Sequence, residues 1–316
     1  MSSSWASGGS TAGGWAATQE RSNRLALRVM AFIAVHLGRR VARWVLHPIT
    51  LYFLAFAPAA RRHSARYLGR VLGRRPRWRE RYRHFHAFAA TVLDRVYFVR
   101  GRMDLFELRI EGDALVDASL AEGRGAFLLG AHLGSFEVLH AIGDRRPGMR
   151  VAMVMYPDNA RKIHAVLQAI EPRFELGIIA IGRPGSTLAI RDWLADNGLV
   201  GLLGDRFVAA DPARAGSVEQ PFLGRPARFT DGPLRLAMLL RRRVIFMVGL
   251  YRGGDRYDVR FEPLADFRSP PDNPAERERL VHDALAAYVR RLEALCREAP
   301  FNWFNFHDFW LEDAQA

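Results

Sequence analysis

The chain has 316 residues, of which 49% are hydrophobic and 25% are charged. These are ordinary values for a globular protein, so collagen-like, coiled-coil and wholly disordered chains are excluded. Its one cysteine, Cys296, excludes an internal disulfide framework and a cysteine-cluster metal site. Forty-six basic against 33 acidic side chains give a formal net charge of +13, which favours an anionic partner: nucleic acid, anionic lipid or an acidic carrier protein.

The first 110 residues divide into two parts. Residues 1–18 are mostly Ser, Gly, Ala and Thr and predict a flexible tail, whereas residues 19–110 are apolar and arginine-rich together. The longest uncharged run, Trp44 to Ala60, contains two prolines, which disfavours a membrane-spanning helix. We therefore predict an N-terminal helical segment that lies in the headgroup region of a membrane, with a buried helical hairpin as the alternative.

Arginines surround this run and continue after it. The flanking residues predicted to face lipid headgroups are Arg39, Arg40, Arg43, Arg61, Arg62 and Arg66. The dense basic stretch from Arg70 to Arg83 predicts either a solvated loop or a docking patch for anionic headgroups or a carrier protein. Nucleic acid is disfavoured because few aromatic residues interleave with the arginines and no helix-turn-helix or RNA-binding motif is visible.

From residue 111 to residue 316 short apolar runs alternate with helical patterns, which predicts an α/β domain with a mostly parallel central sheet flanked by helices. The predicted buried strands are Ala126–Leu129, Val151–Met155, Ile178–Ile181, Leu199–Leu203 and Val244–Leu250, with Tyr257–Phe261 as an edge strand. The predicted helices are Ser135–Ile142, Asn159–Ile170, Ser186–Asn197, Pro233–Arg242 and a long last helix capped by Asn273. Cys296 lies on the apolar side of that last helix and is expected to be an inert core residue.

The segment from Gly130 to Glu137 carries the most chemical information. His132 follows directly on a predicted buried strand, and the carboxyl ends of strands are where open α/β sheets bind ligands. Glu137, in the first turn of the next helix, is expected to accept a hydrogen bond from one imidazole nitrogen and so to hold the other as a base. Taken alone, this pattern more often belongs to a capped helix with a satisfied histidine.

Two later segments change that interpretation. Gly204-Asp205-Arg206 follows the predicted strand Leu199–Leu203, and Phe222-Leu223-Gly224-Arg225-Pro226-Ala227 precedes Thr230-Asp231-Gly232-Pro233. With the His132-to-Glu137 box, these segments resemble the lysophospholipid-acyltransferase superfamily and, within it, the bacterial lipid A late-acyltransferase branch. The resemblance runs from about Arg24 to the C-terminus. Three stretches are also similar to acyltransferases of aryl-polyene-type lipid gene clusters: Phe88–Arg95, Gly130–Glu137 and Ala299–Phe306.

The resemblance implies acyl transfer from a thioester donor, acyl carrier protein or acyl-CoA, to a hydroxyl of a membrane lipid or glycolipid. His132 would be the general base and Glu137 its orienting partner. Asp205 and Arg206 would shape the site or bind polar acceptor groups, while Gly224 and Arg225 belong to a block that would contact phosphate or sugar. Arg161 or Lys162 would stabilise the thioester oxyanion or hold the phosphopantetheine of the donor.

No metal or cofactor is implied, and the expected location is the cytoplasmic face of a bacterial inner membrane. Two rival functions follow from the same residues. A basic membrane- or nucleic-acid-binding module would not need His132, and a thioester hydrolase would release free fatty acid without a lipid acceptor. The aromatic C-terminal run, Phe301 to Trp310, is expected to close the core, with a wall of an acyl groove as the alternative.

Overall fold

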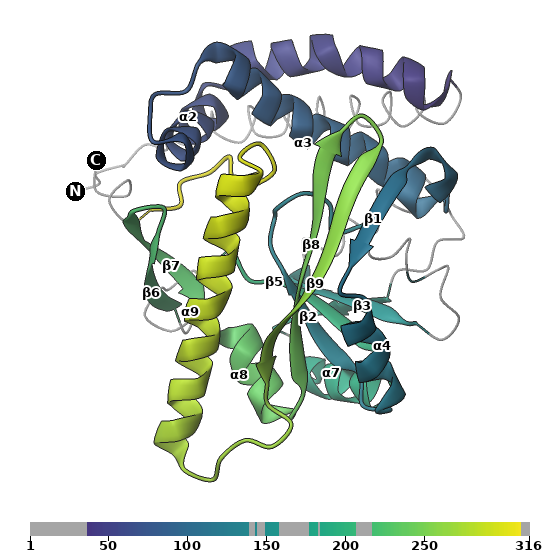
Figure 1. Cartoon of the computed structure of the whole chain (residues 1–316), viewed down its shortest axis with the longest axis vertical. Coiled ribbons are helices and arrows are strands. Elements are labelled where there is room, and N and C mark those ends of the chain that lie inside the picture. Colours follow the sequence, from purple (N-terminus) through teal and green to yellow (C-terminus); the bar gives the residue numbers. More distant parts are fainter. Residues whose placement is uncertain are drawn as a thin grey trace, which may run out of the picture.

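The computed structural model describes residues 37–138, 143, 149–157, 177–182, 184–206 and 217–310. A seven-stranded sheet has the order β1-β9-β8-β2-β5-β3-β4, and a separate two-stranded ribbon pairs β6 with β7 (Figure 1). Every neighbouring pair in the large sheet is parallel except β8 with β9. The strands are β1 (Glu107–Glu111), β2 (Ala126–Gly130), β3 (Val151–Met155), β4 (Gly177–Ala180), β5 (Leu199–Leu203), β6 (Ser217–Phe222), β7 (Arg225–Thr230), β8 (Arg243–Gly253) and β9 (Arg256–Asp266).

Helices pack around this sheet. Residues 37–56 are helical, and the further helices are α2 (Pro58–Leu72), α3 (Trp78–Val99), α4 (Ala114–Ala121), α7 (Ser186–Ala195), α8 (Gly232–Leu239) and α9 (Pro274–Glu298), with a short 3₁₀ turn at Met103–Leu105. Figure 1 shows α3 and the helix over residues 37–56 lying across the end of the sheet where the β8–β9 hairpin turns. The predicted α/β class with a mostly parallel sheet flanked by helices is therefore confirmed.

The predicted strand positions match closely, with one correction. β3 and β5 have the predicted bounds, whereas Tyr257–Phe261 is wrong as an edge strand because β9 lies between β1 and β8. The polar side chains of β9 form ion pairs on one face of the sheet: Asp258 with Arg252, Arg260 with Glu298 and Glu262 with Arg291. β1, which the sequence analysis did not predict, forms one edge. β1 also crosses the predicted boundary between residues 110 and 111. The predicted helix over residues 159–170 lies outside the described residues.

The core lies on both faces of the sheet. In β2, Phe127 and Leu129 belong to one buried apolar cluster, whereas Ala126 and Leu128 belong to the other. Because successive strand residues point to opposite faces, a strand covered on both sides must be apolar at every position. Cys296 is buried in the first of these clusters, as expected for an inert core thiol, and burial raises its pKa.

The helix over residues 37–56 is fastened to the sheet by its arginines. Arg39 donates two hydrogen bonds to the carboxylate of Asp94, at 2.8 and 2.9 Å, and a third to the Gly254 carbonyl at 2.7 Å. Arg43 donates to the same carbonyl at 2.7 Å and to the Tyr251 hydroxyl. The prediction that Arg39 and Arg43 face lipid headgroups is thus wrong, because both bind a buried acid or the hairpin tip instead.

The basic stretch from Arg70 to Arg83 is also partly turned inward. The Arg70 guanidinium lies 4.0 Å from the centre of the Trp310 ring, and that of Arg83 lies 4.4 Å from the centre of the Phe301 ring. Arg74 pairs with Glu80 at 2.6 Å. This stretch joins α2 to α3 and contacts the C-terminal segment, so it is not simply a solvated loop.

Within the part of the chain that the structure describes, no helix is long and apolar enough to cross a bilayer.

Candidate active site

The register of two parallel strands brings His132 and Asp205 together. Gly130 of β2 is paired with Leu203 of β5, and the Gly204 amide continues the ladder to the Gly130 carbonyl at 3.0 Å. His132 and Asp205 each lie two residues beyond this last pair. They therefore leave the same edge of the sheet at the same level, although 73 residues separate them in the chain.

The two side chains form a hydrogen-bonded pair. His132 Nδ1 lies 2.8 Å from Asp205 Oδ1, and the His132 amide donates to Asp205 Oδ2 at 3.0 Å. The indole N–H of Trp303 donates to the same Oδ2 at 2.9 Å. Asp205 is 1% exposed, whereas the side chain of His132 is 30% exposed, so the pair runs from the core to the surface.

This environment fixes the charge of Asp205. Burial alone would raise the pKa of Asp205, but the charge of His132 and the hydrogen bonds from His132 and Trp303 outweigh it and lower that pKa to about 2. Asp205 is therefore a carboxylate at neutral pH. Because a carboxylate only accepts hydrogen bonds, Nδ1 of His132 carries a proton and Nε2 is the nitrogen with a free lone pair. Among the described residues, Nε2 has no hydrogen-bond partner.

A glycine turn holds the loop that carries His132. Gly134 has φ = +72°, and a Cβ there would lie 2.0 Å from the Gly249 carbonyl oxygen, so only glycine fits. The Gly134 amide donates to the Asn302 carbonyl at 2.8 Å, and the Phe304 amide donates to the His132 carbonyl at 2.9 Å. The loop is thus fixed between β8 and the C-terminal segment.

Glu137 does not have the partner that the sequence analysis expected. Its carboxylate pairs with Arg95 of α3 at 2.6 Å and accepts a hydrogen bond from the Ser135 hydroxyl at 3.1 Å. The His132 nitrogen expected to bind Glu137 binds Asp205 instead. The physical reason is that Glu137 lies before the first helical residue, Val138, rather than within the helix, and its carboxylate meets Arg95 of α3 there.

The other predicted site residues differ in where they lie. Arg206 follows Asp205 directly and donates from its guanidinium to the Phe304 carbonyl at 3.1 Å, which places it beside the pair. Gly224 lies in the turn of the β6–β7 ribbon and Arg225 is the first residue of β7, and neither forms a hydrogen bond with the pair in the described structure. The ribbon is linked to the pair indirectly, because Phe222 of β6 packs against Trp303, which binds Asp205. Arg161 lies outside the described residues.

Trp303 is the site residue that the sequence analysis missed. It was expected only to close the core, and at 1% exposure it does so, but its indole N–H also binds Asp205. Its carbonyl lies 2.8 Å from Nε2 of the buried His84, whose Nδ1 lies 2.9 Å from the Ser64 hydroxyl. A buried tryptophan needs a hydrogen-bond acceptor for its N–H. This requirement is the signal in the sequence that could have pointed to a polar partner for Trp303.

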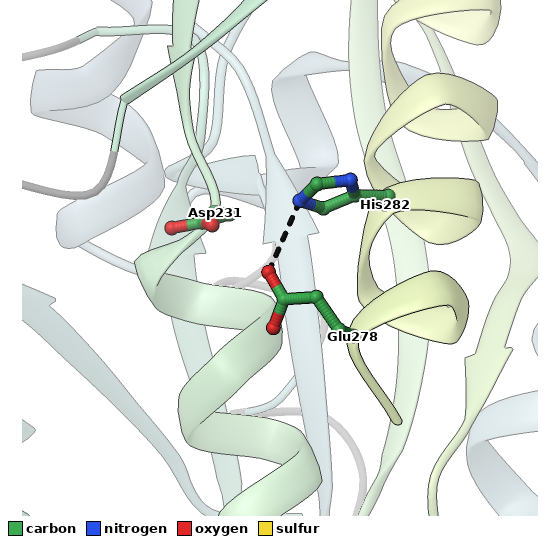
Figure 2. Close-up of side chains that lie close together, drawn as sticks. All are labelled: Asp231, Glu278 and His282. Atoms are coloured by element: carbon green, nitrogen blue, oxygen red, sulfur yellow. Dashed lines mark ion pairs between the residues drawn. The ribbon is translucent and has the colours of Figure 1, made fainter. Parts of the chain in front are cut away.

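A second group of titratable side chains lies at the junction of α8 and α9. Figure 2 shows Glu278 and His282 of α9 facing Asp231 at the start of α8, with donor atoms that all lie within 4.8 Å of one another. Arg235 pairs with Asp231 at 2.7 Å and donates to Glu278 at 2.7 Å, and His282 contacts Glu278 at 3.2 Å. Because the Arg235 guanidinium pairs with both carboxylates, we interpret this group as an ion-pair clamp between the two helices.

The fold and the pair at its edge define a class of protein: an α/β domain in which a partly exposed imidazole is backed by a buried carboxylate. A family model described as bacterial lipid A biosynthesis acyltransferase matches residues 25–312. The chain belongs to this family and is an acyltransferase, which confirms the predicted resemblance at the level of the superfamily. A search of curated proteins found no match.

Proposed function

We propose that the protein transfers a fatty acyl group from a thioester donor to a hydroxyl of a membrane lipid or glycolipid, with His132 as the general base. The observation that carries this proposal is the 2.8 Å contact between His132 Nδ1 and the buried carboxylate of Asp205. It leaves the second imidazole nitrogen available to a substrate. A positioned base of this kind contributes about 10²–10⁴-fold to a rate.

The proposed reaction needs no covalent enzyme intermediate. His132 Nε2 takes the proton of the acceptor hydroxyl while the hydroxyl oxygen bonds to the thioester carbonyl carbon. The carbon–sulfur bond then breaks, and the leaving thiolate takes the proton back from the imidazolium. Asp205 stays ionised throughout and stabilises the imidazolium through Nδ1, which is the role that the sequence analysis gave to Glu137.

Glu137 keeps a role in this proposal as a positioning residue. Its ion pair with Arg95 joins the loop after His132 to α3. Loss of that contact would loosen the loop without removing the proton acceptor. Asp205, Arg206, Gly224 and Arg225 remain proposed substrate contacts, and Arg161 remains the proposed oxyanion or donor ligand.

The surface of the N-terminal helices supports a location on a membrane. Nine of the 13 exposed large apolar side chains in the described residues lie on the helix over 37–56 and on α3. Trp44 is 76% exposed and Phe56 is 71% exposed. Exposed apolar area of this extent on one layer of helices is typical of a surface that inserts into the headgroup region. We propose that this layer rests on the cytoplasmic face of a bacterial inner membrane.

The donor is proposed to be an acyl carrier protein or acyl-CoA, since both are anionic. Exposed arginines at the start of α3, Arg77 and Arg79, flank the exposed Trp78 and offer such a partner a basic surface. The similarity to acyltransferases of aryl-polyene-type gene clusters leaves a lipid other than lipid A as a candidate acceptor.

Lipid mass spectrometry tests the proposal. Membranes from a host that lacks the gene would be compared after complementation with the wild type or with His132→Ala. We expect the wild type, and not the variant, to restore a lipid that is heavier by one acyl group. Restoration of the same lipid by His132→Ala would contradict the role of the base. Free fatty acid formed without any acylated lipid would favour the hydrolase.

A further inference from the structure

One residue, Trp303, contacts both sides of the His132–Asp205 pair. Its backbone forms an antiparallel bridge with Leu133, and the neighbouring Phe304 amide donates to the His132 carbonyl at 2.9 Å. Its side chain reaches the acid, because the indole N–H donates to Asp205 Oδ2 at 2.9 Å. The main chain at this position therefore holds the loop of the base, while the side chain holds the carboxylate.

The indole N–H helps to decide which oxygen of Asp205 meets the imidazole. Oδ2 accepts two N–H groups, from Trp303 at 2.9 Å and from the His132 amide at 3.0 Å, whereas Oδ1 lies 2.8 Å from His132 Nδ1. Two donors on one oxygen hold the carboxylate against rotation about its Cβ–Cγ bond. Hydrogen bonds to an ionised group are stronger than neutral ones, and this one is buried. Without the indole N–H, Oδ2 would keep one donor and the carboxylate could turn away from Nδ1.

His84 fixes the position of Trp303 from α3. Nε2 of His84 lies 2.8 Å from the Trp303 carbonyl, and Nδ1 lies 2.9 Å from the Ser64 hydroxyl of α2. Because the carbonyl only accepts hydrogen bonds, Nε2 carries the proton and the Ser64 hydroxyl donates to Nδ1. Burial keeps this imidazole neutral, since it lowers the pKa of His84 to about 4. A buried chain of hydrogen bonds thus runs from α2 through Trp303 to the acid.

Aromatic rings surround the indole of Trp303. Tyr67, Phe222 and Phe309 each make a T-shaped contact with it, with ring centres 5.0, 5.2 and 4.9 Å away. A second tryptophan, Trp310, is buried in the same apolar cluster, and its ring centre lies 6.1 Å from that of Trp303. The Trp310 indole N–H donates to the Phe222 carbonyl at 3.1 Å rather than to the acid. Trp310 therefore offers a matched control for the indole N–H of Trp303.

From these contacts we propose that Trp303 is a positioning residue for acyl transfer, which orients the Asp205 carboxylate toward the base and is itself held in place by His84. The inference rests on the proposed function, because it assigns Trp303 to the reaction proposed for this site. Trp303 contacts no reacting atom in that reaction, so loss of its N–H should slow the chemical step without weakening the binding of either substrate. A residue that only filled the core would act through stability instead.

Steady-state kinetics of Trp303→Phe and Trp310→Phe test this role, because both variants keep an aromatic ring and lose one buried indole N–H. We expect Trp303→Phe to lower kcat by about 10–100-fold at an unchanged KM, and Trp310→Phe to stay within about threefold of the wild type. The acid side of the pH profile of kcat/KM should move to higher pH by about half a unit in Trp303→Phe alone, because a carboxylate with one donor fewer stabilises the imidazolium more strongly. Melting curves show that both variants are folded. Equal kcat values and equal pH profiles in the two variants would overturn the proposal.

A second pair of variants tests the part of His84. His84→Gln keeps an N–H that can donate to the Trp303 carbonyl, whereas His84→Leu removes it. We expect His84→Leu to lower kcat by about 3–10-fold and His84→Gln to keep most of the rate. Equal rates in these two variants, with both folded, would overturn the contribution of His84.

Proton NMR on the full-length protein reads the pair without turnover and separates this inference from the proposed function. The downfield signal of the proton on His132 Nδ1 is assigned by its loss in His132→Ala, and it should move in Trp303→Phe but not in Trp310→Phe. If Trp303→Phe does not fold, the same signal is compared between His84→Leu and His84→Gln. A moved signal in a protein that acylates no lipid would support the positioning role and refute the proposed function. An unmoved signal in a Trp303→Phe variant that transfers acyl groups at the wild-type rate would overturn the positioning role alone.

Discussion

Two buried aspartates in this protein have different partners, and we propose different roles for them on that ground. Asp94, in the N-terminal clamp made with Arg39 and Tyr257, has both carboxylate oxygens bound by groups that lead back into the protein. Asp205, at the proposed catalytic edge with His132 and Trp303, is equally buried but binds an imidazole that is 30% exposed. We therefore propose that Asp94, whose partners are internal, serves stability, and that Asp205, whose partner is partly exposed, serves the reaction.

The pKa values of Asp94 and Asp205 are shifted in opposite directions, in line with their different partners. Burial raises the pKa of Asp94 more than its bonds to Arg39 and Tyr257 lower it. For Asp205 the bonds to His132 and Trp303 outweigh burial, and the pKa falls to about 2. The catalytic edge thus keeps its carboxylate charged, as a partner of an imidazolium must be.

The largest expected effect is on catalysis at the catalytic edge. His132→Ala removes the proposed proton acceptor and should reduce acyl transfer by about 10²–10⁴-fold. The fold should persist, because the loop is held by backbone contacts of Gly134 and Phe304. Transfer of a radiolabelled acyl group to membrane lipid measures the rate, and a melting curve is the control. Transfer within tenfold of the wild type would contradict the assignment.

The next effect concerns stability at the N-terminal clamp. Asp94→Asn leaves the Arg39 guanidinium without its carboxylate, and breaking a buried pair in this way costs about 3–5 kcal/mol. Denaturant unfolding measures the change. Arg102→Met provides the control, because Arg102 forms an exposed pair with Asp104 that should be worth little. If the free energy of unfolding falls equally in the two variants, the proposed difference between internal and surface ion pairs of arginine is wrong.

His84, which joins α3 to Trp303, should make stability depend on pH. Burial lowers its pKa from 6.5 to about 4, so the unfolded chain binds a proton that the folded chain does not. The stability is intact above pH 6.5 and is lost as the pH falls toward 4, with about 2 kcal/mol lost at pH 5. Melting curves at pH 7 and pH 5 should differ less in His84→Gln than in the wild type, whereas the exposed His282→Gln should behave like the wild type. An unchanged difference in His84→Gln would refute this origin.

The smallest effect concerns the membrane surface of the N-terminal helices. Trp44→Ser together with Phe56→Ser removes two exposed apolar side chains, each worth about 1–2 kcal/mol when transferred from water. Partition onto vesicles of anionic phospholipid, measured by sedimentation, should fall at least tenfold. Leu239→Ser, an exposed leucine of α8, is the control and should not change it. Equal partition of both variants would place the membrane contact elsewhere.

Hydrophobic runs were enough to predict the sheet, because strands buried on both faces must be apolar at every position. β3 and β5 were placed to the residue in this way. The edge strand β1 was not found, since its alternating polar residues carry a weaker signal. The inward direction of Arg39 could not be predicted, because its partner Asp94 is 55 residues away on another helix.

The candidate site was predicted in its residues but not in its pairing. His132 and Asp205 were each identified as polar residues after a strand, yet Glu137 was chosen as the partner because it is near in sequence. The order of the strands, with β2 beside β5, decides the pairing, and no local pattern encodes that order. Trp303 was recognised as core, and only the fold shows that its N–H meets Asp205.

One comparison tests the central claim most directly: the rate of acyl transfer by Asp205→Asn and by Glu137→Gln, measured side by side with His132→Ala. Both substitutions keep the shape of the side chain and remove its charge. The account predicts that Asp205→Asn approaches the loss of His132→Ala, because the imidazolium loses its carboxylate, while Glu137→Gln stays within about tenfold of the wild type. A collapse of Glu137→Gln with an active Asp205→Asn would contradict it and return the orienting role to Glu137.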